Sequence, residues 1–595
     1  AHLSFECLNL NVFKSRVLVI ERGLTNTWPF TFYFFAVQIF YYLLYNISEI
    51  AERQNRARQS KLPKICVGGK VHMKNDFLSR TLAVINDFSV EEQLFLYDNA
   101  RRLKEKVRNK EDISEFQIKG NTGIYIVFLE SSTRTKESFI NAAKFHKNAK
   151  VNIFDSEHSS FNKQESYVDT FNMLTGYSDY SIFILRTRLE GVCRLLEQKV
   201  GDFADRHGIV RPAFINGGDG KHEHPTQELL DEYTFLEQNN FDNSHIRIAL
   251  VGDLLHGRTV HSKADGLKVF KNVEVDLVAP QQLQMPQSYV DKMKRNGFEV
   301  RTYNSIEEYL SYGSPAKIWY FTRLQLERMG EDILEKAHVL KKAVTFRREF
   351  LDRIPEDAKF YHPLPRPKVE PEIPTFLDSL PLNGWEGQAI NGYWVRVVLL
   401  SMFGGALTAG FDTTVRREEP IEDFIVPASI IDGTKGTQKE GKRGIKPIDN
   451  GTVIDHIAKG KSTDEIYNTI LKIRKILRLY DIDSADGIFK SADGNCKGYI
   501  SLPDRYLSFK EIKKLSAISP NTTVNIVKNG KVEEKYRINL PPRIYGFDEI
   551  RCKNENCITN PVNGEGVNAS FVRVDGKFVC EYCETPHEYH EIWNI

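Results

Sequence analysis

The sequence has little of what marks several classes of protein. Its 595 residues include only eight cysteines, too few for a disulfide scaffold. The 81 basic residues nearly balance the 79 acidic ones, so the net charge gives no indication of a nucleic-acid partner. We find no internal repeat, no long low-complexity tract and no Gly-x-Gly-x-x-Gly, the fingerprint of a dinucleotide site. The length and the rest of the composition are typical of a globular enzyme of about four domains.

Residues 1–72 stand apart from this composition. Trp28 to Tyr45 has eighteen residues without a charge, the lower length limit for a membrane helix, and five basic residues follow it. The run is mostly aromatic and contains Pro29 and Gln38. We interpret Met73 as the natural start and residues 1–72 as upstream or non-native sequence. A membrane anchor is the alternative, and a signal peptide is disfavoured because no basic segment precedes the run.

The cysteines that the chain does have are concentrated near its end. Cys552-x4-Cys557 and Cys580-x2-Cys583 are two close pairs separated by 22 residues, the spacing of a tetrahedral four-cysteine zinc site. Four sulfur ligands leave no open position, so one structural zinc per chain is expected. Disulfides are the alternative, but so few cysteines, clustered in this way, indicate a reducing, cytoplasmic compartment.

Strands and helices alternate through the middle of the chain. An amphipathic helix within 86–106 begins with the capping box of Ser89 and Glu92. Buried strands are expected at 124–129, 151–155 and 180–186. A second unit has a strand at 247–254, a helix at 259–270 and a strand at 273–280. This alternation predicts α/β domains with parallel sheets.

Two short polar stretches carry the chemistry. Ser132, Thr133, Arg134 and Thr135 stand where a strand runs into a helix, and a helix N-terminus favours a phosphate. Arg134 can bind a phosphate and a carbonyl oxygen together. His224-Pro225-Thr226-Gln227 supplies an imidazole and an amide suited to polarising a carbonyl. The pair indicates a phosphorylated carbonyl substrate, although either stretch alone is more often a helix cap or a structural histidine.

These two stretches and a third, His362-Pro363-Leu364-Pro365-Arg366, occur in an order that resembles the catalytic chain of aspartate carbamoyltransferases. The resemblance implies two Rossmann-like parallel-sheet domains in a homotrimer or a multiple of trimers. It implies attack of the L-aspartate amine on carbamoyl phosphate, which gives N-carbamoyl-L-aspartate and phosphate in de novo pyrimidine biosynthesis. Such a transfer needs orientation and a polarised carbonyl rather than a covalent nucleophile.

The resemblance assigns the carbamoyl-phosphate site. Arg134 and Thr135 would reach the carbonyl oxygen, His224 would hydrogen-bond it, and Gln227 would take the carbamoyl NH2. Arg186 would lie beside the phosphate.

A neighbouring subunit is expected to complete this site. Ser159 and Lys163 match a loop that crosses between subunits in the family, although Gln164 stands where glycine is expected. A solvated surface lysine is the alternative for Lys163.

Aspartate has two carboxylates, so its site should offer two guanidiniums. Arg258 and Arg323 match these positions, with Gln325 near Arg323, and the carbonyls of Leu364 and Pro365 would receive the amine. A cationic amino acid such as ornithine would be repelled by Arg323, which favours aspartate over another amine. The other alternative is a catalytically silent, nucleotide-sensing scaffold, which would be expected to lose residues such as Arg134, His224 or Lys163.

The C-terminal third resembles the regulatory chain of aspartate carbamoyltransferases, through GTVIDHI (451–457), SPNTTVNIV (519–527) and the terminal cysteines. The resemblance implies a fused polypeptide with an α+β nucleotide-binding domain, controlled by effectors such as CTP, UTP or ATP. The matching positions are Asp455, His456, Lys497, Asn525 and Lys535. Ser501 stands where a lysine is expected, with Lys497 as its substitute. A stabilising module with a vestigial pocket is the alternative.

Together these patterns divide the chain into six segments. We predict an extra N-terminal segment, a carbamoyl-phosphate domain, an aspartate domain, a polar linker, a regulatory domain and a small all-β zinc domain. Their ranges are 1–72, 73–225 completed by helices within 376–415, 226–375, 416–446, 447–544 and 545–595.

Overall fold

The computed structural model describes residues 77–154, 165–325, 337–367, 371–411, 424–430, 447–480, 483–490 and 494–594. The aromatic run at 28–45 and the loop with Ser159, Lys163 and Gln164 lie outside these ranges. Among the helices that are described, none is long and apolar enough to cross a membrane. The chain separates into two units, 1–73 and 74–595, and the second unit contains all of the elements below.

The first domain is built on a parallel sheet with the strand order β1-β5-β4-β2-β3. Every residue of the central strands β2 and β4 is buried, as predicted. The prediction that 151–155 is a buried strand was wrong, because β3 lies at the sheet edge and Ile153 is 49% exposed. The strands are β1 (Thr81–Leu82), β2 (Thr122–Phe128), β3 (Lys150–Phe154), β4 (Tyr180–Thr187) and β5 (Ala213–Asp219).

Helices follow the strands and cover this sheet. Ser89 caps the first helix, where its hydroxyl accepts from Glu92 N and the Glu92 carboxylate accepts from Ser89 N, which confirms the predicted capping box. The helices are α3 (Val90–Asn109), α4 (Thr133–Phe145), α5 (Tyr167–Thr175), α6 (Val192–His207) and α7 (Pro225–Gln238).

The second domain has another parallel sheet, in the order β10-β9-β6-β7-β8. The single helix predicted at 259–270 was wrong: it is interrupted at Ser262, whose hydroxyl hydrogen-bonds Glu223 and the Arg258 carbonyl. The strands are β6 (His245–Gly252), β7 (Asn272–Val278), β8 (Glu299–Tyr303), β9 (Ile318–Thr322) and β10 (Lys359–Tyr361). The helices are α8 (Arg258–His261), α9 (Lys263–Gly266), α10 (Gln287–Arg295), α11 (Ile306–Ser311) and α13 (Ala337–Val344).

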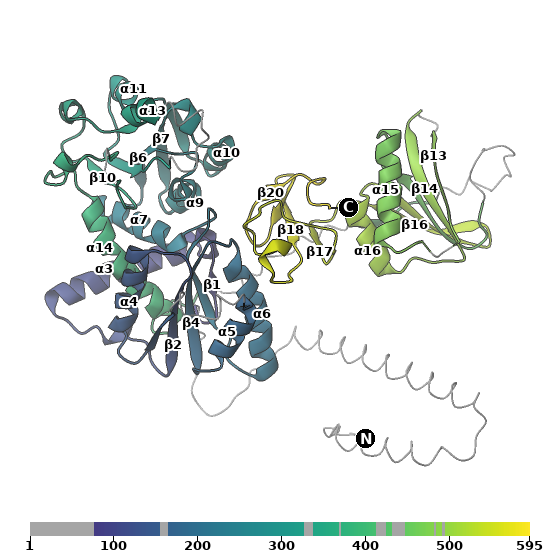
Figure 1. The fold of residues 1–595 in the computed structure, drawn as a ribbon, viewed down its shortest axis with the longest axis horizontal. Helices are drawn as coiled ribbons and strands as arrows, with labels where there is room; N and C mark the ends of the chain where they lie inside the picture. Colours follow the sequence, from purple (N-terminus) through teal and green to yellow (C-terminus); the bar gives the residue numbers. More distant parts are fainter. Residues whose placement is uncertain are drawn as a thin grey trace, which may run out of the picture. The chain divides into compact units, whose positions relative to one another are not determined.

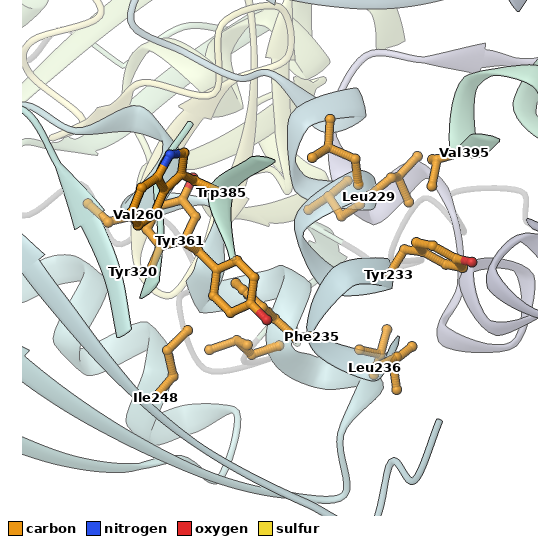
Figure 2. Close-up of a cluster of buried hydrophobic side chains, with 14 of the residues drawn as sticks. Leu229, Tyr233, Phe235, Leu236, Ile248, Val260, Tyr320, Tyr361, Trp385 and Val395 are labelled. Atoms are coloured by element: carbon orange, nitrogen blue, oxygen red, sulfur yellow. The ribbon is translucent and has the colours of Figure 1, made fainter. Parts of the chain in front are cut away.

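Two helices join these domains through a shared core. Helix α14 (Trp385–Phe403), green in Figure 1, comes after the second sheet in the chain but packs against α3, α4 and α7. It is apolar nearly all round, as expected for a helix that is buried on most sides. Figure 2 shows Leu229 of α7 beside Val395 of α14. On the same helix as Leu229, Phe235 packs edge-on against Tyr320 and Tyr361 of the second sheet.

The C-terminal third contains two antiparallel sheets. The larger has the order β11-β16-β15-β12-β14-β13 and carries two helices, whose buried isoleucine and leucine residues recur every three or four residues. Strand β11 falls within the range predicted as linker and pairs with β16. The elements are β11 (Ile425–Pro427), β12 (Gly451–Ile457), α15 (Thr463–Ile476), β13 (Ala485–Lys490), β14 (Cys496–Pro503), α16 (Phe509–Ile518), β15 (Thr523–Lys528) and β16 (Lys531–Ile538).

The smaller sheet, β17-β18-β19-β20, holds the terminal cysteines and confirms the predicted all-β end. Its strands are β17 (Arg543–Tyr545), β18 (Ser570–Val574), β19 (Lys577–Cys580) and β20 (Pro586–His587).

Candidate functional site

The N-terminus of α4 is open toward the carboxyl edge of the first sheet. Ser132 occupies the N-cap position, but its hydroxyl makes no capping hydrogen bond, and the first turn carries no acidic residue. Thr133 and Arg134 are exposed, whereas Thr135 is buried. The hydroxyls, the guanidinium and the backbone N–H groups of this turn can therefore bind an anion such as phosphate.

The N-terminus of α7 meets that of α4 at this edge. His224 Nε2 lies 3.4 Å from Thr135 Oγ1, and His224 Nδ1 lies 3.4 Å from Thr226 Oγ1. Burial, and then the charges of Arg258 and Arg186, hold the pKa of His224 well below its ordinary value of 6.5. Both contacts fit either neutral tautomer; the one in which Nδ1 accepts from the Thr226 hydroxyl places the proton on Nε2, which faces Thr135.

Two arginines flank the end of β5. Arg186 Nη1 donates to the Gly217 carbonyl at 3.0 Å, and Arg258 donates to the Gly220 carbonyl. A Cβ on Gly218 would lie 2.5 Å from Arg186 Nη1 and 3.3 Å from Arg258 Nη2, so glycine leaves the space that both guanidiniums use. Burial, followed by the nearby Arg258, lowers the pKa of Arg186 to about 10. Two guanidiniums thus lie at the end of β5, and Arg186 also pairs with Glu130 at 3.0 Å.

The second domain contributes two loops. Arg323 and Gln325 follow β9, and the Gln325 N–H donates to Asp253 Oδ2 at 3.1 Å. In the 362–366 loop the Leu364 N–H donates to His362 Nδ1 at 2.7 Å, which holds Leu364 at a positive φ of 55°. Leu364 is half-buried and Pro365 is exposed.

Charges from both domains act on the same buried histidine. The pKa of His362 falls to about 3 through burial and then through the charges of Arg366, Arg134 and Arg323. Arg134 belongs to the first domain and Arg323 to the second, so positive charges from both domains act on His362.

Three polar residues at this site were not predicted. Arg396 is buried in α14, where its Nη1 donates to Ser138 Oγ at 2.9 Å. Its signal in the sequence is a lone arginine within an apolar helix. His362 begins a motif that was interpreted only through its backbone, and Asp231 stands one turn after Gln227, whose Nε2 donates to Asp231 Oδ1 at 2.8 Å.

The predicted effector residues come together on neighbouring strands. Lys497 Nζ of β14 lies 2.9 Å from Asp455 Oδ2 and 3.2 Å from His456 Nε2, both on β12. It also lies 4.7 Å from the centre of the Phe489 ring. An aromatic face, a carboxylate and a cation are thus within reach of one another.

The remaining predicted effector residues belong to the adjoining hairpin. Asn525 of β15 pairs with Val453 of β12 on one side and with Lys535 of β16 on the other. The charge of Lys535 contributes to the lowered pKa of His456, for which burial is the main cause. Ser501 is buried, so a lysine in its place would be buried as well.

The four terminal cysteines form a candidate metal centre. Their sulfur atoms lie within 4.8 Å of one another, with Cys552–Cys583 at 3.5 Å and Cys557–Cys580 at 3.8 Å. A tetrahedral site with zinc–sulfur bonds of about 2.3 Å has sulfur–sulfur edges of about 3.8 Å. All four are free thiols, so the cluster fits one structural zinc and not the alternative of disulfides.

Four family models match successive parts of the chain. Residues 80–237 match the carbamoyl-phosphate-binding domain of aspartate/ornithine carbamoyltransferases, and 244–403 match their Asp/Orn-binding domain. Residues 443–539 match the allosteric domain of the aspartate carbamoyltransferase regulatory chain, and 542–593 match its metal-binding domain.

Relatives match most of the chain. It is 75% identical to protein PyrBI of Thermotoga maritima over 527 residues, which cover 88% of this chain and 100% of the relative. It is 50% identical to protein PyrBI of Treponema denticola over 533 residues, 88% of this chain and 99% of that one. The aspartate carbamoyltransferase catalytic subunit of Methanobrevibacter smithii is 35% identical over 325 residues, 54% of this chain and 94% of the subunit. The chain therefore belongs to the PyrBI family, in which an aspartate carbamoyltransferase catalytic region and the two domains of the regulatory chain are fused in one polypeptide.

Proposed function

We propose that this protein catalyses carbamoyl transfer from carbamoyl phosphate to the amine of L-aspartate, in cytoplasmic pyrimidine biosynthesis and under nucleotide control. One observation carries the proposal. Thr135 Oγ1 and His224 Nε2, from residues 89 positions apart, lie 3.4 Å from each other at the open N-terminus of α4. Two donors in this position can share one carbonyl oxygen while the phosphate of the same molecule rests on the helix N-terminus.

The first substrate would be held by groups at the carboxyl edge of the first sheet. Its phosphate binds the first turn of α4 and Arg186. Arg134, Thr135 and the neutral His224 imidazole donate to the carbonyl oxygen, and this stabilises the negative charge that grows there during attack. The residues proposed for this substrate are Ser132, Thr133, Arg134, Thr135, Arg186, His224 and Gln227.

L-Aspartate would bind between the two domains. Its carboxylates pair with the guanidiniums of Arg258 and Arg323, assisted by Gln325. The backbone carbonyls of Leu364 and Pro365 accept from the amine and direct its lone pair toward the carbamoyl carbon. Catalysis arises from orientation and charge neutralisation, without a covalent intermediate.

Further parts of the proposal concern other chains and other ligands. Ser159 and Lys163 of a neighbouring subunit complete the phosphate site, so the active form is a trimer or a multiple of trimers. A nucleotide such as CTP, UTP or ATP binds on the regulatory sheet at Asp455, His456, Lys497, Asn525 and Lys535. The zinc ion would supply folding energy to the small all-β domain and take no part in the chemistry.

A colorimetric assay for the ureido product tests the proposal, with aspartate and ornithine compared and each nucleotide added in turn. Aspartate should give product and ornithine none. Arg134→Ala should lower kcat/KM roughly 100- to 1,000-fold, because it removes a donor to the developing charge. The matched control is Lys144→Ala, an exposed residue on the same helix, which should leave the rate unchanged. Absence of product with aspartate would overturn the proposed reaction, and a rate unaffected by every nucleotide would overturn the effector site.

A further inference from the structure

A fully buried carboxylate links the segments that carry the site. Asp231 lies on α7 with no exposed surface, and both of its oxygens accept hydrogen bonds. Gln227 Nε2 and Gln388 Nε2 donate to Oδ1 at 2.8 and 2.6 Å. The Tyr320 hydroxyl and Lys263 Nζ lie 2.7 and 3.0 Å from Oδ2. Every one of these four contacts is a donor, and the two oxygens of a carboxylate can accept all four.

The contact with Gln227 fixes which end of its amide is available. A carboxylate only accepts hydrogen bonds, so the NH2 end of Gln227 must face Asp231. The oxygen Oε1 is then the end left for a substrate. An amide oxygen accepts from an N–H group and gains nothing from a methyl group. Because Asp231 orients this amide, Gln227 Oε1 can accept a hydrogen bond from an NH2 group on the substrate but gains no such bond from a methyl group.

The contact with Gln388 extends the same control to the second domain. Gln388 donates its NH2 to Asp231, and its Oε1 accepts from the His362 N–H at 2.9 Å. His362 begins the loop whose Leu364 and Pro365 carbonyls are proposed to receive the amine. One carboxylate thus orients both amides, and through Gln388 it anchors the start of that loop.

Two further residues hold Asp231 itself. Tyr320 stands on β9, three residues before Arg323, and Lys263 lies in α9, five residues after Arg258. Lys263 is completely buried and brings the positive charge that a buried carboxylate requires. The position of Asp231 therefore depends on elements from both domains.

We propose that Asp231 is a positioning residue that makes the enzyme select carbamoyl phosphate over acyl phosphates lacking an NH2 group. It does so through Gln227 and does not touch the substrate. The inference rests on the proposed function, because the NH2 group that it detects is that of carbamoyl phosphate. Acetyl phosphate is the matched probe, since a methyl group replaces the NH2 and the rest of the molecule is the same.

The test measures kcat/KM for carbamoyl phosphate and the inhibition constant of acetyl phosphate as its competitor. Asp231→Asn replaces one accepting oxygen with an NH2 group, so the side chain can no longer accept from all four donors. The amide of Gln227 or Gln388 is then no longer held in one orientation. We expect kcat/KM for carbamoyl phosphate to fall roughly 10- to 100-fold. The inhibition constant of acetyl phosphate should change by less than about 3-fold. Glu232→Gln, a nearly isosteric change on the same helix that leaves the contacts of Asp231 in place, should leave both values unchanged.

Other outcomes separate the possibilities. If kcat/KM for carbamoyl phosphate falls by the same factor as the inhibition constant of acetyl phosphate rises, Asp231 only maintains the fold. That result would overturn the inference. If Asp231→Asn does not fold, the charge-balanced pair Asp231→Asn with Lys263→Met serves as the second variant, with the same ratio as its readout. Wild-type protein that forms no ureido product would instead overturn the proposed function.

Discussion

Helix α7 passes through two buried clusters of opposite sign. The arginine cluster surrounds His224 at the start of the helix and consists of Arg186, Arg258 and Arg396. The lysine cluster lies along the next turns, where Lys263 is enclosed by three acids of α7. Its Nζ is 2.7 Å from Glu228, 3.0 Å from Asp231 and 3.4 Å from Glu232, and all four side chains are at most 1% exposed.

The two clusters differ in how their charge is compensated. In the lysine cluster three acids meet one cation, and burial raises the pKa values of Glu228 and Glu232, which favours their uncharged forms. In the arginine cluster Arg186 pairs with Glu130, while the described hydrogen bonds of Arg258 and Arg396 go to carbonyls and hydroxyls. Three guanidiniums around His224 suit an anionic ligand, whereas acids gathered around one buried lysine suit a scaffold.

Removing the cation of the lysine cluster should have the largest effect. Lys263→Met leaves Asp231 and its neighbours buried without a counter-charge, which should lower the free energy of unfolding by about 3–5 kcal/mol. The urea midpoint measures this loss. The control is Lys268→Met, which removes a partly exposed ion pair with Asp265 and should cost less than about 1 kcal/mol. Equal costs would mean that the lysine cluster is not a scaffold.

Crowding the same cluster should have an intermediate effect. A Cβ on Gly266 would lie 2.0 Å from Glu228 Oε1, so Gly266→Ala must push this carboxylate away from Lys263. We expect a cost of about 1–3 kcal/mol, and adding Glu228→Ala should recover part of it by making room. Gly387→Ala on α14 is the control, since its Cβ would meet nothing within 4 Å. A melting temperature that does not respond to Gly266→Ala would contradict the close packing.

The pH dependence of the free energy of unfolding should have opposite signs in the two clusters. This is the smallest of the three expected effects. Unfolded histidine binds a proton below about pH 6.5, but His224 resists protonation, so its contribution weakens as the pH falls. Unfolded glutamate loses its proton above about pH 4.5, but burial raises the pKa of Glu232 in the folded protein, so its contribution to stability weakens as the pH rises.

Urea midpoints from pH 5 to 7 measure both contributions. The free energy of unfolding of wild type minus that of His224→Gln should decrease toward pH 5, by at most about 1.4 kcal/mol per pH unit. The corresponding difference between wild type and Glu232→Gln should decrease toward pH 7 instead. Parallel trends in the two variants would remove the contrast between the clusters.

Features encoded by neighbours in the sequence were predictable. The capping box of Ser89 and Glu92 and the strand that leads to Ser132 depend on residues a few positions apart, as does each of the two close cysteine pairs. Strand β3 was misjudged because its place at the sheet edge follows from strand order, which apolar composition does not report. Ser262, where the predicted helix is interrupted, hydrogen-bonds Glu223 from 39 positions away, a contact that local sequence does not report.

The residues that were missed depend on contacts over still longer separations. Asp231 receives its partners Gln388 and Tyr320 from 157 and 89 positions away. In the sequence nothing distinguishes it from the other acids of α7, Glu228, Glu232 and Glu237. Arg396 reaches Ser138 across 258 positions. Such partnerships exist only once segments that are far apart in the sequence pack together, so residue spacing alone could not reveal them.

The late position of α14 in the chain has a consequence for synthesis. The sheet of the first domain is complete at Asp219, yet the helix that buries α3, α4 and α7 ends only at Phe403. At roughly 5–20 residues per second, a ribosome needs roughly 10–40 s to make the intervening chain. During that time the apolar faces that await α14 have no permanent cover. The first domain therefore cannot complete its core before the chain has been made as far as Phe403.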